Sequence, residues 1–171
     1  MIFFDINEHQ IGDKVCCFQM PKLGDQWKIF FDFKPTEYIQ DERLRTCVFL
    51  ALLAHNDRRA NCLGLAIRGS SKIFLHCGIL HFGGVLDGEK EVAFESNELP
   101  VIDKWTRVEI SHEKENDKYF LYLTVGGKEL GRKDVTTEEL RGAPGTLLCI
   151  GENDPGLIQP GFIRRLVALK K

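Results

Sequence analysis

Alternation of apolar and polar residues with a period of two is the feature of this sequence that most limits its fold. In the segment 24–35, Trp27, Ile29, Phe31 and Phe33 fall on one side of an extended chain, and mostly charged residues fall on the other. A strand with two such different faces buries one of them and exposes the other. Pro35 then ends the ladder of hydrogen bonds. The segment is therefore predicted to be a half-buried β-strand.

The same period returns along the chain, with turn residues between the repeats. Further strands are expected at 63–67, 72–79, 105–112, 118–125, 128–132, 147–150 and 162–169. The first two should form a hairpin, and so should the next two, across a polar loop at 113–117. One short helical turn is expected, because Thr136 to Glu139 has the pattern of a capping box. In all, about twelve strands are expected.

Many short strands with almost no helix predict an all-β fold, a two-sheet antiparallel jelly-roll sandwich. The chain of 171 residues has 43% hydrophobic and 28% charged residues, as globular proteins do. A second domain would leave each half with a marginal core. We therefore expect residues 1–171 to form a single jelly-roll domain.

Charge and hydropathy limit the partners and the compartment. The net charge of −2 gives no broad positive field, so we expect no nucleic acid partner. The apolar run 48–54 is far shorter than the roughly 20 residues of a membrane-spanning helix, so no membrane insertion is expected. The first residues lack the basic segment of a signal peptide. A leaderless or intracellular protein is therefore favoured over an extracellular one.

The order of segments resembles the laminin G-like branch of the concanavalin A-like jelly rolls over roughly residues 15 to 169. The matching pieces are the tryptophan strand 27–33, the run 52–57 leading into 63–67, the hairpin 105–110 with 121–128, and the closing strand 148–152 with 161–166. Gly126 stands where the hairpin of that group often has Asp, and the group's late cysteine pair is missing. These departures indicate a distant member.

This resemblance implies a non-catalytic recognition module that binds a glycan or a protein partner through its loop rim or an outer sheet face. Two alternatives remain open. Residues 55–58, with the sequence His-Asn-Asp-Arg, are similar to a galectin sugar-binding strand, which suggests a soluble carbohydrate-binding lectin. The chain could equally be a structural β subunit of a larger assembly, or form a homo-oligomer.

No catalytic motif supports an enzyme. The sequence has no Gly-x-Ser-x-Gly elbow, phosphate-binding loop or dinucleotide fingerprint. The acidic stretch 89–95 lacks the central carboxylate of the glycosidase pattern found on this fold. We therefore expect no catalysis and no required cofactor.

Two binding sites are candidates. Laminin G-like domains often bind calcium at the rim, and the resemblance places such a site at Asp57, Asn61 and Asp154, because calcium prefers oxygen ligands. The second candidate is an outer sheet face, where an aromatic ring stacks on a sugar and polar groups hold its hydroxyls. That patch would consist of Asn56, Arg58, Arg107, Glu109 and Tyr122.

Overall fold

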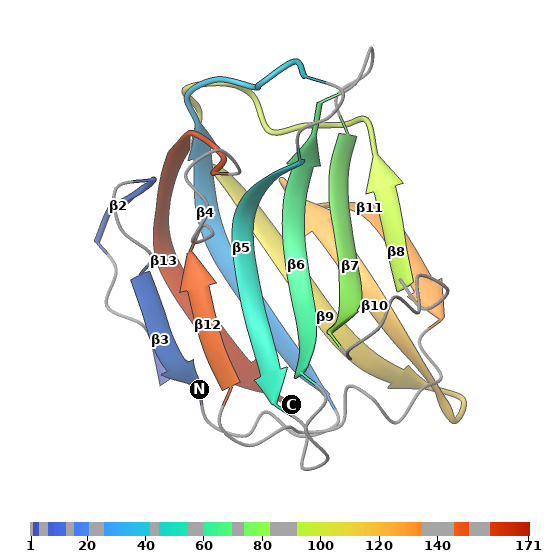
Figure 1. The fold of residues 1–171 in the computed structure, drawn as a ribbon. Coiled ribbons are helices and arrows are strands. Elements are labelled where there is room, and N and C mark those ends of the chain that lie inside the picture. The colour runs from blue at the N-terminus through green and yellow to red at the C-terminus, as the bar shows by residue number, and fades with distance from the viewer. Residues whose placement is uncertain are drawn as a thin grey trace.

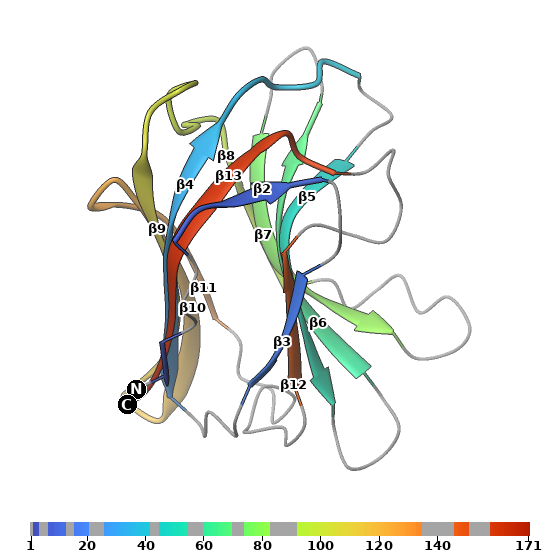
Figure 2. The ribbon, with the colours of Figure 1, turned by 90° about the vertical axis from the view of Figure 1, so that its left-hand side faces the viewer.

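Two antiparallel sheets stacked face to face form the molecule (Figure 1; Figure 2). The computed structural model describes residues 2–3, 7–12, 16–20, 26–41, 45–54, 60–69, 74–82, 92–134, 146–150 and 158–171. Within these ranges the chain forms thirteen strands and no helix. No helix long and apolar enough to cross a membrane occurs in this part of the chain. The all-β sandwich predicted from the period of two is confirmed.

We name the seven-stranded layer sheet A. Its strand order is β1 (Ile2–Phe3), β13 (Gly161–Lys170), β4 (Trp27–Pro35), β9 (Thr106–Glu115), β10 (Lys118–Val125) and β11 (Lys128–Asp134). Strand β2 (His9–Ile11) also pairs with β13. The middle of the sheet, β4–β9–β10, contains the longest regular ladders.

The six-stranded layer is sheet B. Its strand order is β3 (Cys16–Met20), β12 (Thr146–Ile150), β5 (Arg45–Ala54), β6 (Ala60–Arg68), β7 (Phe74–Phe82) and β8 (Val92–Ser96). The expected hairpin between the segments 63–67 and 72–79 corresponds to the antiparallel pair β6–β7.

The core lies between the sheets and is built from the alternating residues of sheet A. Trp27, Ile29, Phe31 and Phe33 of β4 are between 0% and 1% exposed, as their spacing predicted. They pack in one cluster with inward residues of β9 and β10 and with Val48, Leu65, Ile67 and Ile150 of sheet B. Full burial of one such side chain contributes about 1.5 to 3 kcal/mol, so burial of this cluster makes a large contribution to the stability of the fold.

The β9–β10 connection is shorter than the sequence suggested. A polar loop was expected at 113–117, but β9 runs on to Glu115 and only Asn116 and Asp117 make the turn. Their φ angles of 48° and 64° are those of a type I′ turn, which continues the twist of the strands and so lets the ladder extend to its end. Gly126 and Gly127, with φ of 60° and 85°, make the second such turn, between β10 and β11. The expected helical turn at Thr136 to Glu139 lies outside the described residues.

A buried polar contact ties the two sheets together at one end of the sandwich. Gln159, just before β13, is fully buried. Its amide nitrogen donates to the Glu37 carbonyl oxygen at 2.7 Å and to the Pro160 carbonyl oxygen at 3.0 Å. The hydroxyl of Thr46, on β5, donates to the Gln159 side-chain oxygen at 2.7 Å. A side chain of the sheet A segment thus satisfies groups from both layers.

This contact makes a stability prediction. Replacing Gln159 by Ala should lower the free energy of unfolding by about 1 to 3 kcal/mol, because the Glu37 carbonyl loses its donor and the Thr46 hydroxyl keeps only its longer hydrogen bond to the Ile67 carbonyl oxygen, at 3.1 Å. Urea denaturation would measure the change. Gln10→Ala, an exposed position on β2, is the matched control and should change little. Equal effects of the two substitutions would contradict the assigned role of Gln159.

Candidate functional site

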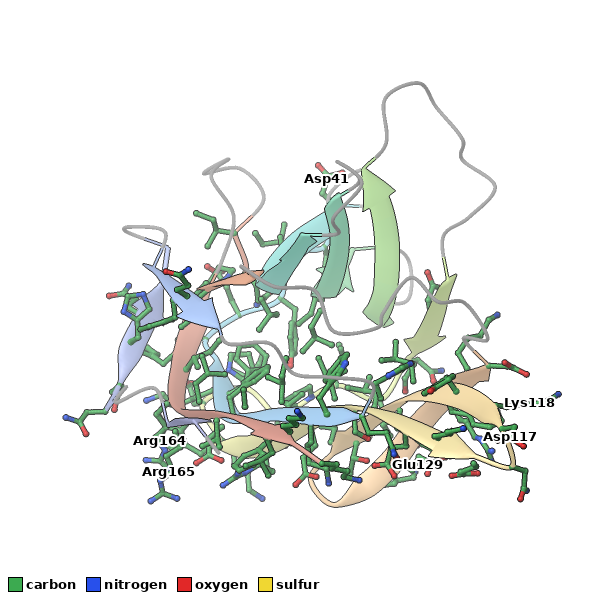
Figure 3. All side chains as sticks on the ribbon, turned by 90° about the horizontal axis from the view of Figure 1, so that it is seen from below. Asp41, Asp117, Lys118, Glu129, Arg164 and Arg165 are labelled. Atoms are coloured by element: carbon green, nitrogen blue, oxygen red, sulfur yellow. The ribbon has the colours of Figure 1, made fainter. Side chains whose placement is uncertain are left out.

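The outer face of sheet A, turned away from the core, carries many polar and aromatic side chains. Because successive residues of a strand alternate faces, the partners of the buried stripe emerge here in cross-strand rows. The register gives the rows Lys34–Phe162, Arg164–Asp32–Arg107, Phe30–Glu109–Thr124–Glu129, Lys28–Ser111–Tyr122–Arg132 and Glu113–Phe120–Asp134. Figure 3 shows Arg164 and Arg165 near one end of this face and Glu129, Asp117 and Lys118 toward the other.

A hollow of about 390 Å³ lies on this face around Tyr122, and we call it the polar hollow. It is lined by Lys28, Ser111, Glu113, Glu115, Tyr122, Thr124, Glu129 and Arg132. Every one of these residues has a side chain able to donate or accept a hydrogen bond, and both signs of charge are present. The floor comes from β9 and β10, and one wall comes from β11.

Ion pairs hold the side chains of the polar hollow in place. The Arg132 guanidinium donates to Glu115 at 2.7 Å and lies over the Phe120 ring, 3.8 Å from its centroid. The Tyr122 hydroxyl donates to the same Glu115 carboxylate. Lys28 pairs with Glu109 at 3.0 Å. These contacts orient Lys28, Glu115, Tyr122 and Arg132 within the lining.

Two pKa values in the polar hollow are shifted by these neighbours. Loss of hydration at the Tyr122 hydroxyl, followed by its hydrogen bond to Glu115, raises the pKa of Tyr122 to about 12. Tyr122 therefore remains a neutral donor at physiological pH. The hydrogen bond from Lys171 lowers the pKa of Glu113, despite an opposing effect of burial, so Glu113 remains an anionic acceptor.

A second cluster lies around Asp32 on β4, and we call Asp32 with Arg107, Arg164 and Arg165 the arginine cluster. The Asp32 side chain is only 8% exposed, and its carboxylate lies 2.8 Å from Arg107, 3.3 Å from Arg164 and 3.5 Å from Arg165. Rings support two of the cations, since Arg107 lies over Phe30 and Arg164 over Trp105, at 4.6 Å and 4.1 Å from the ring centroids.

A larger hollow of about 520 Å³, the rim hollow, opens beside the arginine cluster where the β8–β9 connection meets the β10–β11 turn. Trp105 and Arg107 line it together with Leu99, Val101 and Leu130. Lys128 and Glu98 form an ion pair at its edge, with 2.5 Å between the charged atoms. Because three aliphatic side chains and Trp105 line it, the rim hollow is more apolar than the polar hollow.

The chain matches no protein-family model and no curated protein. Solved structures do resemble it. The ligand-binding domain of botulinum neurotoxin serotype D, in complex with N-acetylneuraminic acid, has a TM-score of 0.67 at 11% identity, over 96% of this chain and 39% of that one. The CBM40 domain of the Ruminococcus gnavus IT-sialidase, bound to α2,3-sialyllactose, has a TM-score of 0.61 at 15% identity, over 99% of this chain and 92% of that one.

A galectin from Caenorhabditis elegans adds a third likeness, with a TM-score of 0.51 at 12% identity over 94% of this chain and 96% of that one. At such identities the comparison establishes the fold alone. The fold is a concanavalin A-like jelly roll. The resemblance noted in the sequence is confirmed at this level, whereas the laminin G-like branch is not distinguished from the other jelly rolls.

The jelly roll places three of the five residues predicted for the outer patch on one surface. Arg107 and Glu109 emerge from β9 on the outer face of sheet A, and Tyr122 emerges beside them from β10. Tyr122 lines the polar hollow, and Arg107 lines the rim hollow. Asn56 and Arg58 lie outside the described residues, between β5 and β6 of sheet B.

The residues predicted for calcium are described only in part. Asn61 belongs to β6, where its register partners are Leu53 and His81, and Asp57 and Asp154 lie outside the described residues. No group of three His, Cys, Asp or Glu side chains is close enough to hold a metal within the described ranges. The calcium site therefore stays a prediction.

Other residues of this face were not singled out from the sequence. Lys28 and Asp32 belong to the mostly charged side of the segment 24–35, so the alternation was a usable signal for both. Glu113, Arg132 and Arg164 gave no local signal, because their partners lie on other strands.

The arginine cluster makes a second stability prediction. Asp32→Asn should lower the free energy of unfolding by about 2 kcal/mol, because three guanidinium groups would lose their nearly buried counter-charge. Asp117→Asn is the control, since Asp117 is 95% exposed and Asn tolerates the positive φ of that turn. Denaturant unfolding at low salt would compare the two. The role assigned to Asp32 fails if both variants match the wild type.

Proposed function

We propose that this jelly roll is a non-catalytic recognition module that binds a glycan on the outer face of sheet A. The observation that carries the proposal is the polar hollow, a depression that brings Tyr122 together with hydrogen-bond donors and acceptors of both charges. Sugars present apolar C–H faces and many hydroxyl groups, so a site for them combines an aromatic surface with several fixed polar groups.

The hydroxyl groups of a sugar have matching donors and acceptors in this hollow. Tyr122 contributes its half-buried ring and its hydroxyl to a lining that is almost wholly polar, and Glu113, Glu115 and Glu129 accept hydrogen bonds. Lys28 and Arg132 donate them. Since ion pairs already fix most of these side chains, binding would cost little side-chain entropy.

The similar structures support a sugar rather than another small molecule. The CBM40 domain is bound to sialyllactose, and the botulinum neurotoxin domain is in complex with N-acetylneuraminic acid. Their sequences are too distant to transfer a binding site, so the positions named above come from this chain alone.

In its more specific form, the proposal follows the sequence motifs, which favour a laminin G-like module with a glycan or protein partner. The alternative is a galectin-like lectin. Calcium bound through Asp57, Asn61 and Asp154 would belong to the laminin G-like form. A calcium-dependent rise in melting temperature would support this form, because a ligand that binds only the native state stabilises it.

A glycan array, probed with and without calcium, tests the proposed function. The wild-type protein should bind members of the array, and Tyr122→Ala should weaken that binding at least about tenfold, because a central aromatic contact is lost. Tyr122→Phe, which keeps the ring, should retain more binding than Tyr122→Ala.

Lys118→Ala is the control, because Lys118 lies on β10 beyond the polar hollow and is 60% exposed. Circular dichroism should show that all variants remain folded. A wild-type protein that binds nothing on the array, or a folded Tyr122→Ala variant that binds like the wild type, would overturn the proposal.

A further inference from the structure

Strand β13 contains an irregularity that places two consecutive arginines on one face. Its register with β4 shifts between Arg164 and Val167, and Arg165 has a φ of 53°. Neighbouring residues of a regular strand point to opposite faces. Here both Arg164 and Arg165 reach Asp32 on the outer face, because the bulge turns Arg165 to the side of Arg164.

The bulge is costly for a residue other than glycine, since a side chain at positive φ is strained by about 1 kcal/mol or more. The ion pair of Arg165 with Asp32 adds little to the stability of the fold, because the Arg165 side chain is 66% exposed and its guanidinium lies 3.5 Å from the carboxylate. Such bulges are common where a strand presents a side chain to a ligand. The strained backbone at Arg165 is therefore better explained by a role in presenting this side chain to a ligand than by a contribution to stability.

The charges of the arginine cluster do not balance. Asp32 contributes one negative charge, whereas Arg107, Arg164 and Arg165 contribute three positive charges. Each guanidinium has five N–H donors, whereas the single Asp32 carboxylate has only about four acceptor sites for all three guanidiniums. The cluster therefore has spare charge and spare donors at a surface open to solvent.

The geometry favours a planar or tetrahedral oxyanion over a simple counter-ion. The guanidiniums of Arg107 and Arg164 are held in place by the Phe30 and Trp105 rings and by Asp32. Fixed guanidiniums form paired hydrogen bonds with carboxylate, sulfate and phosphate groups. Trp105 and Arg107 also line the rim hollow, which leaves room for the body of a larger ligand beside the cations.

Resting on the proposed function, we infer that the glycan is acidic and that the arginine cluster binds its carboxylate or sulfate group. The oligosaccharide would lie along β9, with one sugar in the polar hollow and the acidic residue at Arg107, Arg164 and Arg165. Arg107 and Ser111 are four residues apart on this strand, about 13 Å by the rise of a strand, which a short oligosaccharide can span.

An array that presents each saccharide backbone in neutral, sialylated and sulfated form tests this inference. The acidic forms should bind about tenfold more tightly than their neutral partners, since each charge-assisted hydrogen bond adds substantially to affinity. The preference should decrease as salt is raised. Preference for the sialylated or for the sulfated members would identify the acidic group as a carboxylate or a sulfate.

Arg165→Gln and Arg164→Gln should each reduce the acidic preference several-fold. Lys118→Gln, which removes one positive charge from the far end of the same sheet, should preserve it. Arg165 is the sharper position, because its exposed side chain contributes little to folding.

Equal binding of neutral and acidic members, or an unchanged preference in both arginine variants, would overturn the acidic site while leaving the glycan module intact. Binding of no member at all would overturn the proposed function itself. The two failures are therefore distinguishable on one array.

Discussion

Burial of the β4 stripe against sheet B is the interaction on which the rest of the molecule depends. Trp27, Ile29, Phe31 and Phe33 anchor the middle of sheet A to the core. Because their neighbours along the strand must then point outward, the same packing determines which side chains reach the outer face. Lys28, Phe30, Asp32 and Lys34 point to the outer face for the same reason that the stripe is buried, although Asp32 itself is covered by its arginine partners.

The outer face adds a second layer of organisation built from charge. Its ion pairs are mostly half exposed, and such pairs contribute little to stability. Their larger effect is to fix orientation: Arg132 lies against Phe120, and Arg164 lies against Trp105. A flat sheet face thereby acquires two distinct environments, a mixed-charge hollow around Tyr122 and a positive cluster around Asp32.

Much of the fold could be predicted from the sequence, because alternation is a local signal. The bounds of β10 and the core face of β4 were both apparent in the order of residues. The length of the β9–β10 turn was not apparent, because Asn116 and Asp117 adopt positive φ values that a polar composition does not reveal.

The site was predictable only in part. Arg107, Glu109 and Tyr122 could be selected as exposed strand residues, but the contact between Asp32 and Arg164 depends on pairing between strands that are far apart in sequence, and the bulge at Arg165 has no sequence signature.

The central claim is that the ligand meets sheet A and not sheet B. Titration of the isotope-labelled protein with the best-bound glycan, followed through backbone amide chemical shifts, tests it most directly. The account predicts that the largest changes fall on β9, β10 and β11, with Arg107, Glu109 and Tyr122 among them. Changes concentrated on β5 to β8, or on the segment that joins β5 to β6, would contradict it.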